Sequence, residues 1–344
     1  MPAAAPHVLV IRRRYLGDIV LLGPVFRSLR LHWPHARLAA LVEAGYADVL
    51  ALNPDVTSTL LLPTRLGAWP SFLHNVRRAR FTHVLDLDNT EKTAAVTRFS
   101  GASVRVALHH GSHRLKFRAA YTHAIHDSPE LHETRPITEY YLRALEPLGV
   151  PAGSHTVQLE PRPDDLAALR RFVGAAGPVL LVHPGSRSPW RIWPADRFAA
   201  ICDRVQETLG AQVVLVGGPA EQALVAEIRR LARSHVFTLP ETPTVPRFAA
   251  LARLSRVMLC HDSGPMHVAA AVGTPVIALY GSQNSALFRP IGAGHTLLQP
   301  SLPCGAACVA AGTCTPGDSY RNCCVRRLSI DEVFAAVRTQ LASR

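Results

Sequence analysis

The chain has 344 residues, a length that fits two domains of ordinary size better than one. With 48% hydrophobic and 18% charged residues, its composition excludes a disordered chain and a coiled coil. The net charge is +12, and only two of the 37 basic residues are lysines. This balance favours an acidic partner, such as nucleic acid, a phosphorylated glycan, a nucleotide or an anionic membrane surface.

The N-terminal segment Met1–Val10 is followed by arginines at positions 12–14, whereas a signal peptide carries its charges before the apolar run. The longest apolar stretch, Val268–Tyr280, is interrupted by a glycine and a proline and is too short to span a bilayer. We therefore expect a cytoplasmic protein. Its seven cysteines are then expected to be thiols or metal ligands rather than disulfides.

In the first half of the chain, short apolar runs alternate with longer helical patterns, as in parallel α/β domains. A helix is predicted from Asp18 to about Leu31, after a loop over residues 13–17. The predicted strands are His7–Arg12, Leu38–Val42, Ser58–Leu62 and Thr82–Leu87.

A proline-rich join near residue 150 precedes a second series of the same kind. We therefore predict two nucleotide-fold-like domains, 1–150 and 178–328, with a linker over 151–177 and a C-terminal helix over 329–344. The predicted strands of the second series are Pro178–Val182, Gln212–Val216, Val257–Cys260 and Pro275–Tyr280. Its predicted helices are Ala195–Leu209, Ala220–Arg233, Gly264–Val272 and Ile330–Leu341.

Two loops after predicted strands of the second half suit a phosphate. In H-P-G-S at 183–186 a Gly-Ser turn lets backbone N–H groups approach an anion, and arginines follow. In H-D-S-G-P-M-H at 261–267 a helix begins, and free N–H groups at a helix start favour phosphate. The plainer roles are a strand-to-helix turn for the first loop, helix capping by Asp262 or Ser263, and packing for His267.

A third loop, G-G-P-A-E at 217–221, is not a dinucleotide fingerprint, because G-x-G-x-x-G is absent. Glu221 stands just past a strand, where an acidic residue can accept hydrogen bonds from ribose hydroxyls. Its alternative role is an acidic residue favoured by the start of a helix.

These motifs, in this order, resemble glycosyltransferase family 9, the ADP-heptose–lipopolysaccharide heptosyltransferase family. The segments that carry the resemblance are V-L-V-I-R-R-R-Y-L-G-D-I-V-L-L-G-P-V-F-R-S-L-R, H-P-G-S with W-R-I-W-P, G-G-P-A-E, and H-D-S-G-P-M-H with G-T-P-V-I-A-L-Y-G. The resemblance implies a GT-B architecture, two Rossmann-like domains with parallel sheets facing across a cleft. The N-terminal domain would bind the acceptor and the C-terminal domain the nucleotide sugar.

The resemblance also assigns donor-binding residues. Glu221 would bind the ribose and Asp262 the transferred sugar, while the loops at residues 186–187 and 263–264 would hold the pyrophosphate. Where the family commonly has a lysine, this chain has Arg191, whose planar fork replaces a compact ammonium. The full predicted donor set is Ser186, Arg187, Arg191, Glu221, Asp262, Ser263, Gly264 and His267.

Asp18 aligns with the aspartate proposed as the base in this family. Inverting transfer needs one base to take the proton of the acceptor hydroxyl, and positive charge where the pyrophosphate leaves. Taken alone, Asp18 would be an acidic residue favoured by a helix start. Arg13 and Arg14 are the predicted acceptor ligands, within a basic lobe that continues over residues 105–123.

Two sequence features suggest metal sites. The first, Asp86-Leu87-Asp88, resembles the D-x-D metal motif of a different glycosyltransferase architecture. It ends a strand of the N-terminal domain, whereas the nucleotide sugar is expected in the C-terminal domain, so we expect no metal there. We also expect no required cofactor. The second is a cysteine-rich loop over 304–324, in which clustered thiols suggest a structural zinc or another thiophilic metal. Its cysteines are Cys304, Cys308, Cys314, Cys323 and Cys324.

The sequence therefore predicts an inverting glycosyltransferase that moves heptose from ADP-heptose to the lipopolysaccharide inner core, with peripheral contact at the cytoplasmic face of the inner membrane. One alternative is a transferase of the same fold that uses another nucleotide sugar for O-chain, capsule or another envelope glycan. Another is a non-catalytic nucleotide-sugar-binding protein. Nucleic acid is not an expected partner, because only the charge favours it.

Overall fold

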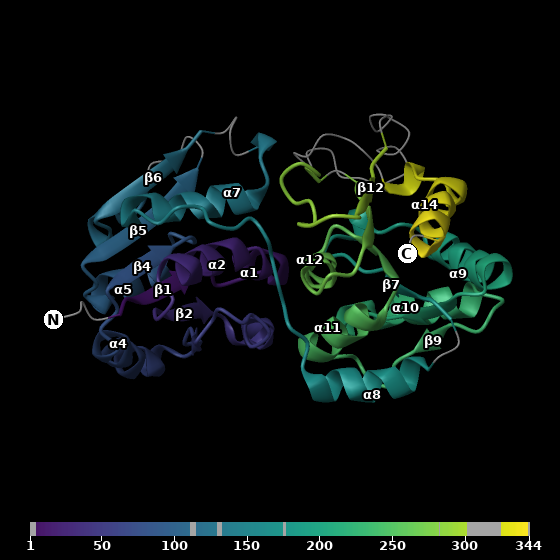
Figure 1. Ribbon diagram of the computed structural model, residues 1–344, viewed down its shortest axis with the longest axis horizontal. Helices are drawn as coiled ribbons and strands as arrows, with labels where there is room; N and C mark the ends of the chain where they lie inside the picture. Colours follow the sequence, from purple (N-terminus) through teal and green to yellow (C-terminus); the bar gives the residue numbers. More distant parts are fainter. Residues whose placement is uncertain are drawn as a thin grey trace. The chain divides into compact units, whose positions relative to one another are not determined.

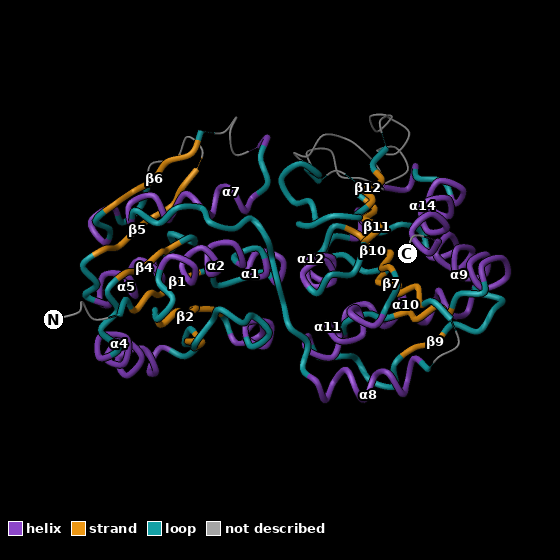
Figure 2. Tube along the Cα trace, viewed as in Figure 1, coloured by secondary structure: helices purple, strands orange, loops and turns teal. Residues whose placement is uncertain are grey.

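A computed structural model describes residues 5–110, 115–128, 133–174, 177–281, 283–300 and 325–342. The chain divides into two compact units, Met1–Gln158 and Leu159–Arg344. Each unit contains one six-stranded parallel sheet whose strands alternate with helices (Figures 1 and 2). The prediction of two Rossmann-like units with parallel sheets is confirmed.

The first unit contains six strands and six α-helices among its described residues. Its strands are β1 (His7–Ile11), β2 (Arg37–Val42), β3 (Ser58–Leu61), β4 (His83–Asp86), β5 (Val104–His110) and β6 (His123–Asp127). Its helices are α1 (Leu16–Val20), α2 (Gly23–His32), α3 (Ala47–Leu50), α4 (Trp69–Arg78), α5 (Glu91–Ser100) and α7 (Ile137–Leu142), with short 3-10 turns η1 (Ala44–Tyr46), η2 (Leu66–Ala68), η3 (Arg118–Ala120) and η4 (Arg143–Leu148).

The second unit repeats this alternation. Its strands are β7 (Val179–His183), β8 (Gln212–Leu215), β9 (Phe237–Thr238), β10 (Val257–His261), β11 (Val276–Leu279) and β12 (Thr296–Leu298). Its helices are α8 (Pro163–Val173), α9 (Ala195–Leu209), α10 (Gln222–Leu231), α11 (Val245–Leu254), α12 (Gly264–Ala271) and α14 (Ile330–Ala342), with 3-10 turns η5 (Pro189–Arg191), η6 (Pro219–Glu221) and η7 (Val325–Arg327).

The strand order is the same in both units. The first sheet runs β3-β2-β1-β4-β5-β6, and the second runs β12-β11-β10-β7-β8-β9. The connections therefore reverse direction between β1 and β4, where Ile11 pairs with Asp86, and between β7 and β10, where His183 pairs with Cys260. Ligands of open α/β sheets bind beyond the carboxyl ends of strands at such reversals. The fold thus marks one candidate position in each unit.

The predicted helix from Asp18 to Leu31 is wrong in one respect: the chain forms two helices there, α1 and α2. Pro24 has no N–H with which to continue the hydrogen-bond ladder through this point. Gly23 lies against Val157, and a Cβ atom at Gly23 would come within 3.2 Å of the Val157 Cα atom. The break leaves Asp18 inside a short helix of its own, directly after the β1 loop.

The expected basic lobe over residues 105–123 includes most of strand β5 and the start of β6. The guanidinium of Arg105 donates to the carbonyl oxygens of Ala120 and Ala102, the first at 2.8 Å. Arg118 donates to the carbonyl oxygen of Tyr121. These two arginines therefore stabilise turns of the backbone. Residues 111–114 of the expected lobe lie outside the described part of the chain.

The core of the second unit lies between its sheet and helices α9 and α14. Trp193 is fully buried there, and its indole N–H donates to the carbonyl oxygen of Leu328 at 2.9 Å. Cys202 and Cys260 are also fully buried free thiols. This packing anchors the loop after β7 to the segment that leads into α14.

Candidate active-site residues of the two units

Asp18 lies just beyond the carboxyl end of β1, on helix α1. Its Oδ1 atom accepts hydrogen bonds from the Arg12 guanidinium at 2.8 Å and from the Tyr141 hydroxyl at 2.7 Å. The side chain is 15% exposed. Among the described residues, no donor reaches its Oδ2 atom. One oxygen is thus anchored, and the other can accept a proton.

Arg12 joins this carboxylate to the end of β4. It also donates to the carbonyl oxygen of Leu87 at 3.0 Å and to the carboxylate of Asp88 at 3.1 Å. Burial alone would lower the pKa of Arg12, but Tyr141, Asp18 and Asp88 raise it above its ordinary value. Arg12 therefore stays charged and fixes the orientation of Asp18.

Tyr141 comes from helix α7 and supplies the second donor to Asp18. Burial raises its pKa well above the ordinary tyrosine value, the charge of Arg12 opposes the shift, and the carboxylate of Asp18 adds to it. The phenol therefore remains protonated and keeps donating. Sequence analysis missed Tyr141, since it lies 123 positions from Asp18 and no local motif marks it.

Arg13 and Arg14, the predicted acceptor ligands, differ in their surroundings. The Arg13 side chain is 12% exposed, and it forms ion pairs with Asp88 at 2.9 Å and with Glu43 at 3.1 Å. The Arg14 side chain is 49% exposed, and within the described residues its one ion pair is with Glu43, at 3.4 Å. Arg13 therefore cross-links the loops after β1, β2 and β4, whereas Arg14 is the more open cation.

Asp86 and Asp88 are engaged with donors of the protein. Asp86 is fully buried and accepts from the backbone N–H groups of Asp88 and Asn89 and from the Tyr121 hydroxyl. Burial raises its pKa. No group of three histidine, cysteine or acidic side chains in the described part of the chain could hold a metal ion. The cysteine-rich loop, 304–324, lies outside that part.

In the second unit, Glu221 fills space that three glycines leave open. A Cβ atom added at Gly185 would lie 2.3 Å from the Glu221 Cγ atom, and one at Gly218 would lie 2.7 Å from its Oε2 atom. At Gly217 the added atom would lie 2.9 Å from the Glu221 Cβ atom. The motifs H-P-G-S and G-G-P-A-E therefore meet, and their glycines fix the position of one carboxylate beyond β7 and β8.

The loop after β7 carries three further predicted donor residues. The Oγ atom of Ser186 is buried and has no hydrogen-bond partner within the described residues. Arg191 donates to the side-chain amide oxygen of the buried Gln283. Arg187 is exposed in the same loop. The sequence did not predict a role for Gln283, because no motif marks it and only its contact with Arg191 indicates one.

Helix α12 begins directly after β10, with Ser263 in extended backbone before Gly264. The hydroxyl of Ser263 donates to the carbonyl oxygen of His261 at 3.3 Å and does not cap the helix. The expected capping role of Ser263 is therefore wrong. Asp262 is half-buried beside this helix start. His267, within the helix, is buried.

His261 holds the two loops of this region together. Its Nε2 atom accepts from the backbone N–H of Trp193 at 3.1 Å, and its Nδ1 atom lies 3.4 Å from the carbonyl oxygen of Leu279. Burial lowers the pKa of His261 to about 3. A neutral ring therefore links the W-R-I-W-P segment to β10 and β11.

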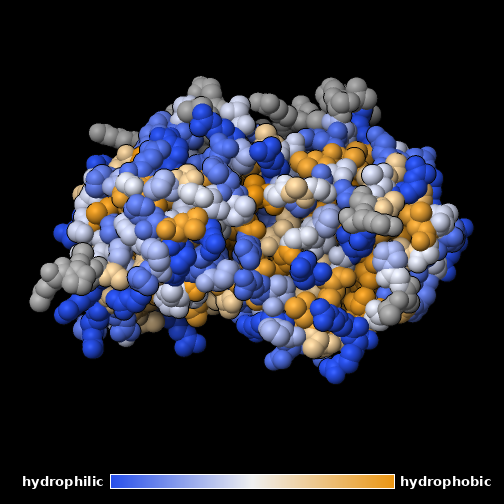
Figure 3. All heavy atoms as spheres, in the orientation of Figure 1, coloured by the Kyte–Doolittle hydropathy of each residue, from blue (hydrophilic) through white to orange (hydrophobic). Residues whose placement is uncertain are grey.

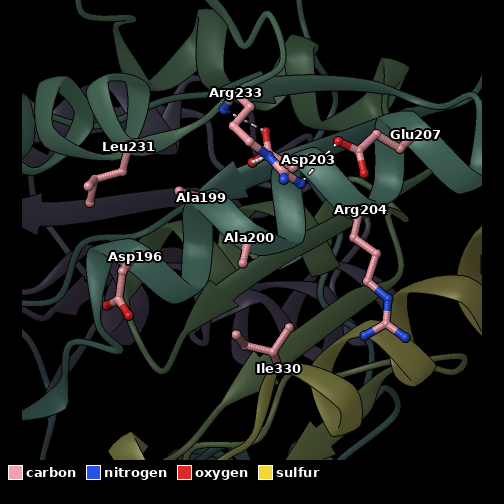
Figure 4. A pocket seen from close by; sticks show the side chains of 9 residues that line it. All are labelled: Asp196, Ala199, Ala200, Asp203, Arg204, Glu207, Leu231, Arg233 and Ile330. Carbon is pink, nitrogen blue, oxygen red and sulfur yellow. Dashed lines mark hydrogen bonds and ion pairs between the residues drawn. The ribbon is translucent and has the colours of Figure 1, made fainter.

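A surface hollow of about 510 Å³ lies away from these loops, between α9, the end of α10 and the start of α14 (Figure 4). Arg233 forms ion pairs there with Asp203 at 3.3 Å and Glu207 at 3.1 Å. Asp203 also accepts from the backbone and hydroxyl of Ser234. These ion pairs join helix α9 to the segment that follows α10. The charges of Arg233, Asp203 and Glu207 are therefore used within the protein.

The comparisons with known proteins agree on one family. The family model described as glycosyltransferase family 9 (heptosyltransferase) matches residues 69–313. Lipopolysaccharide heptosyltransferase 3 of Escherichia coli K12 is 28% identical over 292 residues, which cover 80% of this chain and 83% of that protein.

Two solved structures share the fold over nearly the whole chain. The glycosyl transferase family 9 protein of Veillonella parvula has a TM-score of 0.83 at 23% identity, covering 99% of this chain and 98% of that one. The ADP-heptose lipopolysaccharide heptosyltransferase II of E. coli has a TM-score of 0.78 at 20% identity, covering 97% and 98%. The two-unit arrangement of parallel sheets is thus the GT-B fold of these proteins.

The buried, neutral His261 predicts a loss of stability in acid. Below about pH 6.5 the unfolded chain gains a proton at this position, whereas the folded ring stays neutral until its pKa near 3. Each such group lowers the free energy of unfolding by up to about 1.4 kcal/mol per pH unit in that window. Urea unfolding at pH 7.5, 6.5 and 5.5 should show a shallower dependence in His261→Gln than in the wild type.

The exposed His32 provides the matched control, because His32→Gln removes a histidine without removing a buried one. We expect its stability to follow the wild-type pH dependence. Equal slopes for the wild type and His261→Gln would contradict the role assigned to this ring.

Proposed function

This chain belongs to glycosyltransferase family 9, and from that membership we propose that it transfers heptose from ADP-heptose to the inner core of lipopolysaccharide, with inversion at the anomeric carbon. The observation that carries the proposal is Asp18, a carboxylate with one anchored and one open oxygen beyond β1. A general base needs this combination of fixed orientation and access.

The donor is assigned to the second unit, within the predicted domain of residues 178–328. The start of helix α12 at Ser263 and Gly264 would present N–H groups and a positive dipole end to the diphosphate. The buried Ser186 hydroxyl offers a further donor, and Arg187 offers charge. Arg191 would act through its contact with Gln283, which sets its direction.

The sugar and ribose ends of the donor are assigned to the two carboxylates of this unit. Glu221 would accept hydrogen bonds from the ribose hydroxyls, because the surrounding glycines hold it beyond β7 and β8. Asp262, at the tip of β10, would bind hydroxyls of the transferred heptose. His267, which is buried on α12, would complete the donor-binding set.

The acceptor is assigned to the first unit, within the predicted domain of residues 1–150. The attacking hydroxyl oxygen of the acceptor forms a bond to the anomeric carbon of the donor heptose. The bond from that carbon to the β-phosphate oxygen breaks at the same time. The electron pair leaves with ADP, and the hydroxyl proton passes to Oδ2 of Asp18. Arg14, with half of its side chain exposed, would attract the anionic core, and Arg13 would position the loop.

The test is turnover of an Asp18→Asn variant, measured as ADP release with heptose-deficient lipopolysaccharide. The amide retains the shape of the side chain but cannot take the proton. We expect kcat to fall roughly 10²- to 10⁴-fold, the range typical of a lost general base. The Kd for ADP, measured by calorimetry, should remain unchanged.

Glu221→Gln is the matched control, since it makes the same carboxylate-to-amide change in the other unit. We expect it to weaken ADP binding and to leave kcat at saturating donor near the wild-type value. An Asp18→Asn variant that retains wild-type turnover would contradict the assignment of the base.

We also propose that the protein works at the cytoplasmic face of the inner membrane, where a lipid-linked acceptor is made. Its net charge of +12 favours contact with anionic headgroups. None of the described helices combines the length and the apolar character that crossing a bilayer requires. The proposed contact is therefore peripheral.

We further propose a structural zinc, or another thiophilic metal, in the cysteine-rich loop. Five thiols within 304–324 form a donor set that suits such an ion, and a cysteine-only site would be structural rather than catalytic. Protein purified under reducing conditions should contain about one equivalent of metal, and Cys308→Ser/Cys314→Ser should lose it. Cys202→Ser, outside the cluster, should retain it. Less than about half an equivalent in the wild type would refute the site.

A further inference from the structure

Residues 56–85 contain four arginines and no acidic residue. In the structure they form strand β3, turn η2, helix α4 and the lead into β4, which we call the β3–α4 surface. Strand β3 is the edge strand of the first sheet, so one of its sides has no neighbouring strand. Hydrophilic side chains gather over α4 in Figure 3. The arginines of this surface are Arg65, Arg77, Arg78 and Arg80.

Within the described chain, no ion pair includes any of these arginines. The acidic residues on either side in sequence are occupied. Asp55 pairs with Arg27 at 3.3 Å, and Asp86 is fully buried. Arginines without a carboxylate partner favour an anionic partner outside the chain.

The same surface exposes apolar side chains. Leu66, at the start of η2, is 87% exposed, and Leu61, at the end of β3, is 48% exposed. Between β3 and α4 lies a hollow of about 310 Å³, lined mainly by apolar side chains such as Leu60, Phe72 and Phe81. Arg78 lies one helical turn after Asn75, another lining residue of the hollow.

We infer that the β3–α4 surface docks on an anionic lipid bilayer, with Leu66 entering the headgroup region. A bilayer is the partner that satisfies both features, because its anionic headgroups attract arginines and its interior accepts exposed leucines. A nucleic acid would match the charge but would leave Leu61 and Leu66 without a partner. A second copy of the chain would bring the same positive charge to the interface.

The inference deepens the peripheral membrane contact proposed above, but it depends on this surface alone. The full-length protein should sediment with vesicles of phosphatidylcholine that contain phosphatidylglycerol, and not with vesicles of phosphatidylcholine alone. Binding should weaken as salt is raised, because ions screen the attraction.

Arg65→Gln/Arg78→Gln should reduce the partition coefficient roughly 30-fold, since each arginine near an anionic surface favours binding about fivefold. Leu66→Ser should reduce it several-fold at a salt concentration that screens the charges. The matched control is Arg170→Gln/Arg171→Gln, which removes the same charge from the last turn of another exposed helix, α8. We expect that control to bind like the wild type.

Equal binding to both vesicle types, or an equal loss in the α8 control, would overturn the inference. So would a change of oligomeric state in Leu66→Ser, which would assign the surface to a second copy. ADP release with a delipidated, water-soluble core acceptor should be unaffected in all three variants. A wild-type protein that binds anionic vesicles but releases no ADP would refute the proposed reaction and leave this inference standing.

Discussion

The Arg12 guanidinium determines how the carboxyl edge of the first sheet is organised. It connects Asp18, Asp88 and the carbonyl oxygen of Leu87, so it fastens the loop after β1 to the loop after β4. These strands are the ones between which the chain reverses direction. A partly buried charge with several acceptors resists displacement, because removing one partner leaves the others uncompensated. Asp18 therefore keeps a fixed orientation although it lies on a helix of five residues.

The second unit positions the carboxylate of Glu221 through glycine-containing loops. Its strand order places the loops after β7, β8 and β10 at the carboxyl edge of the sheet. Glycines in the loops after β7 and β8 leave the space that the Glu221 side chain occupies. His261 and Trp193 then fix the loop backbone through a buried neutral ring. The donor assigned to this unit carries negative charge, which the N–H groups and the positive dipole end at the start of α12 favour.

Most of the fold was predictable, because parallel strands buried on both faces appear in sequence as short apolar runs, as at 179–183 and 257–261. Strands β5 and β6 were missed because Arg105, His109 and His123 interrupt that pattern. The individual loop motifs were visible in sequence, whereas their contacts were not. The hydroxyl of Tyr141 and the meeting of Gly185 with Glu221 depend on tertiary packing that no local pattern encodes.

The most direct measurement of this account is kcat for ADP release by an Arg12→Lys variant at saturating donor. Lysine retains the positive charge, but its single nitrogen cannot donate to Asp18, Asp88 and Leu87 in the planar arrangement that arginine provides. The account predicts that kcat falls roughly 10-fold or more while ADP binding and folding are preserved. Wild-type kcat in this variant would contradict the claim that Arg12 orients the base.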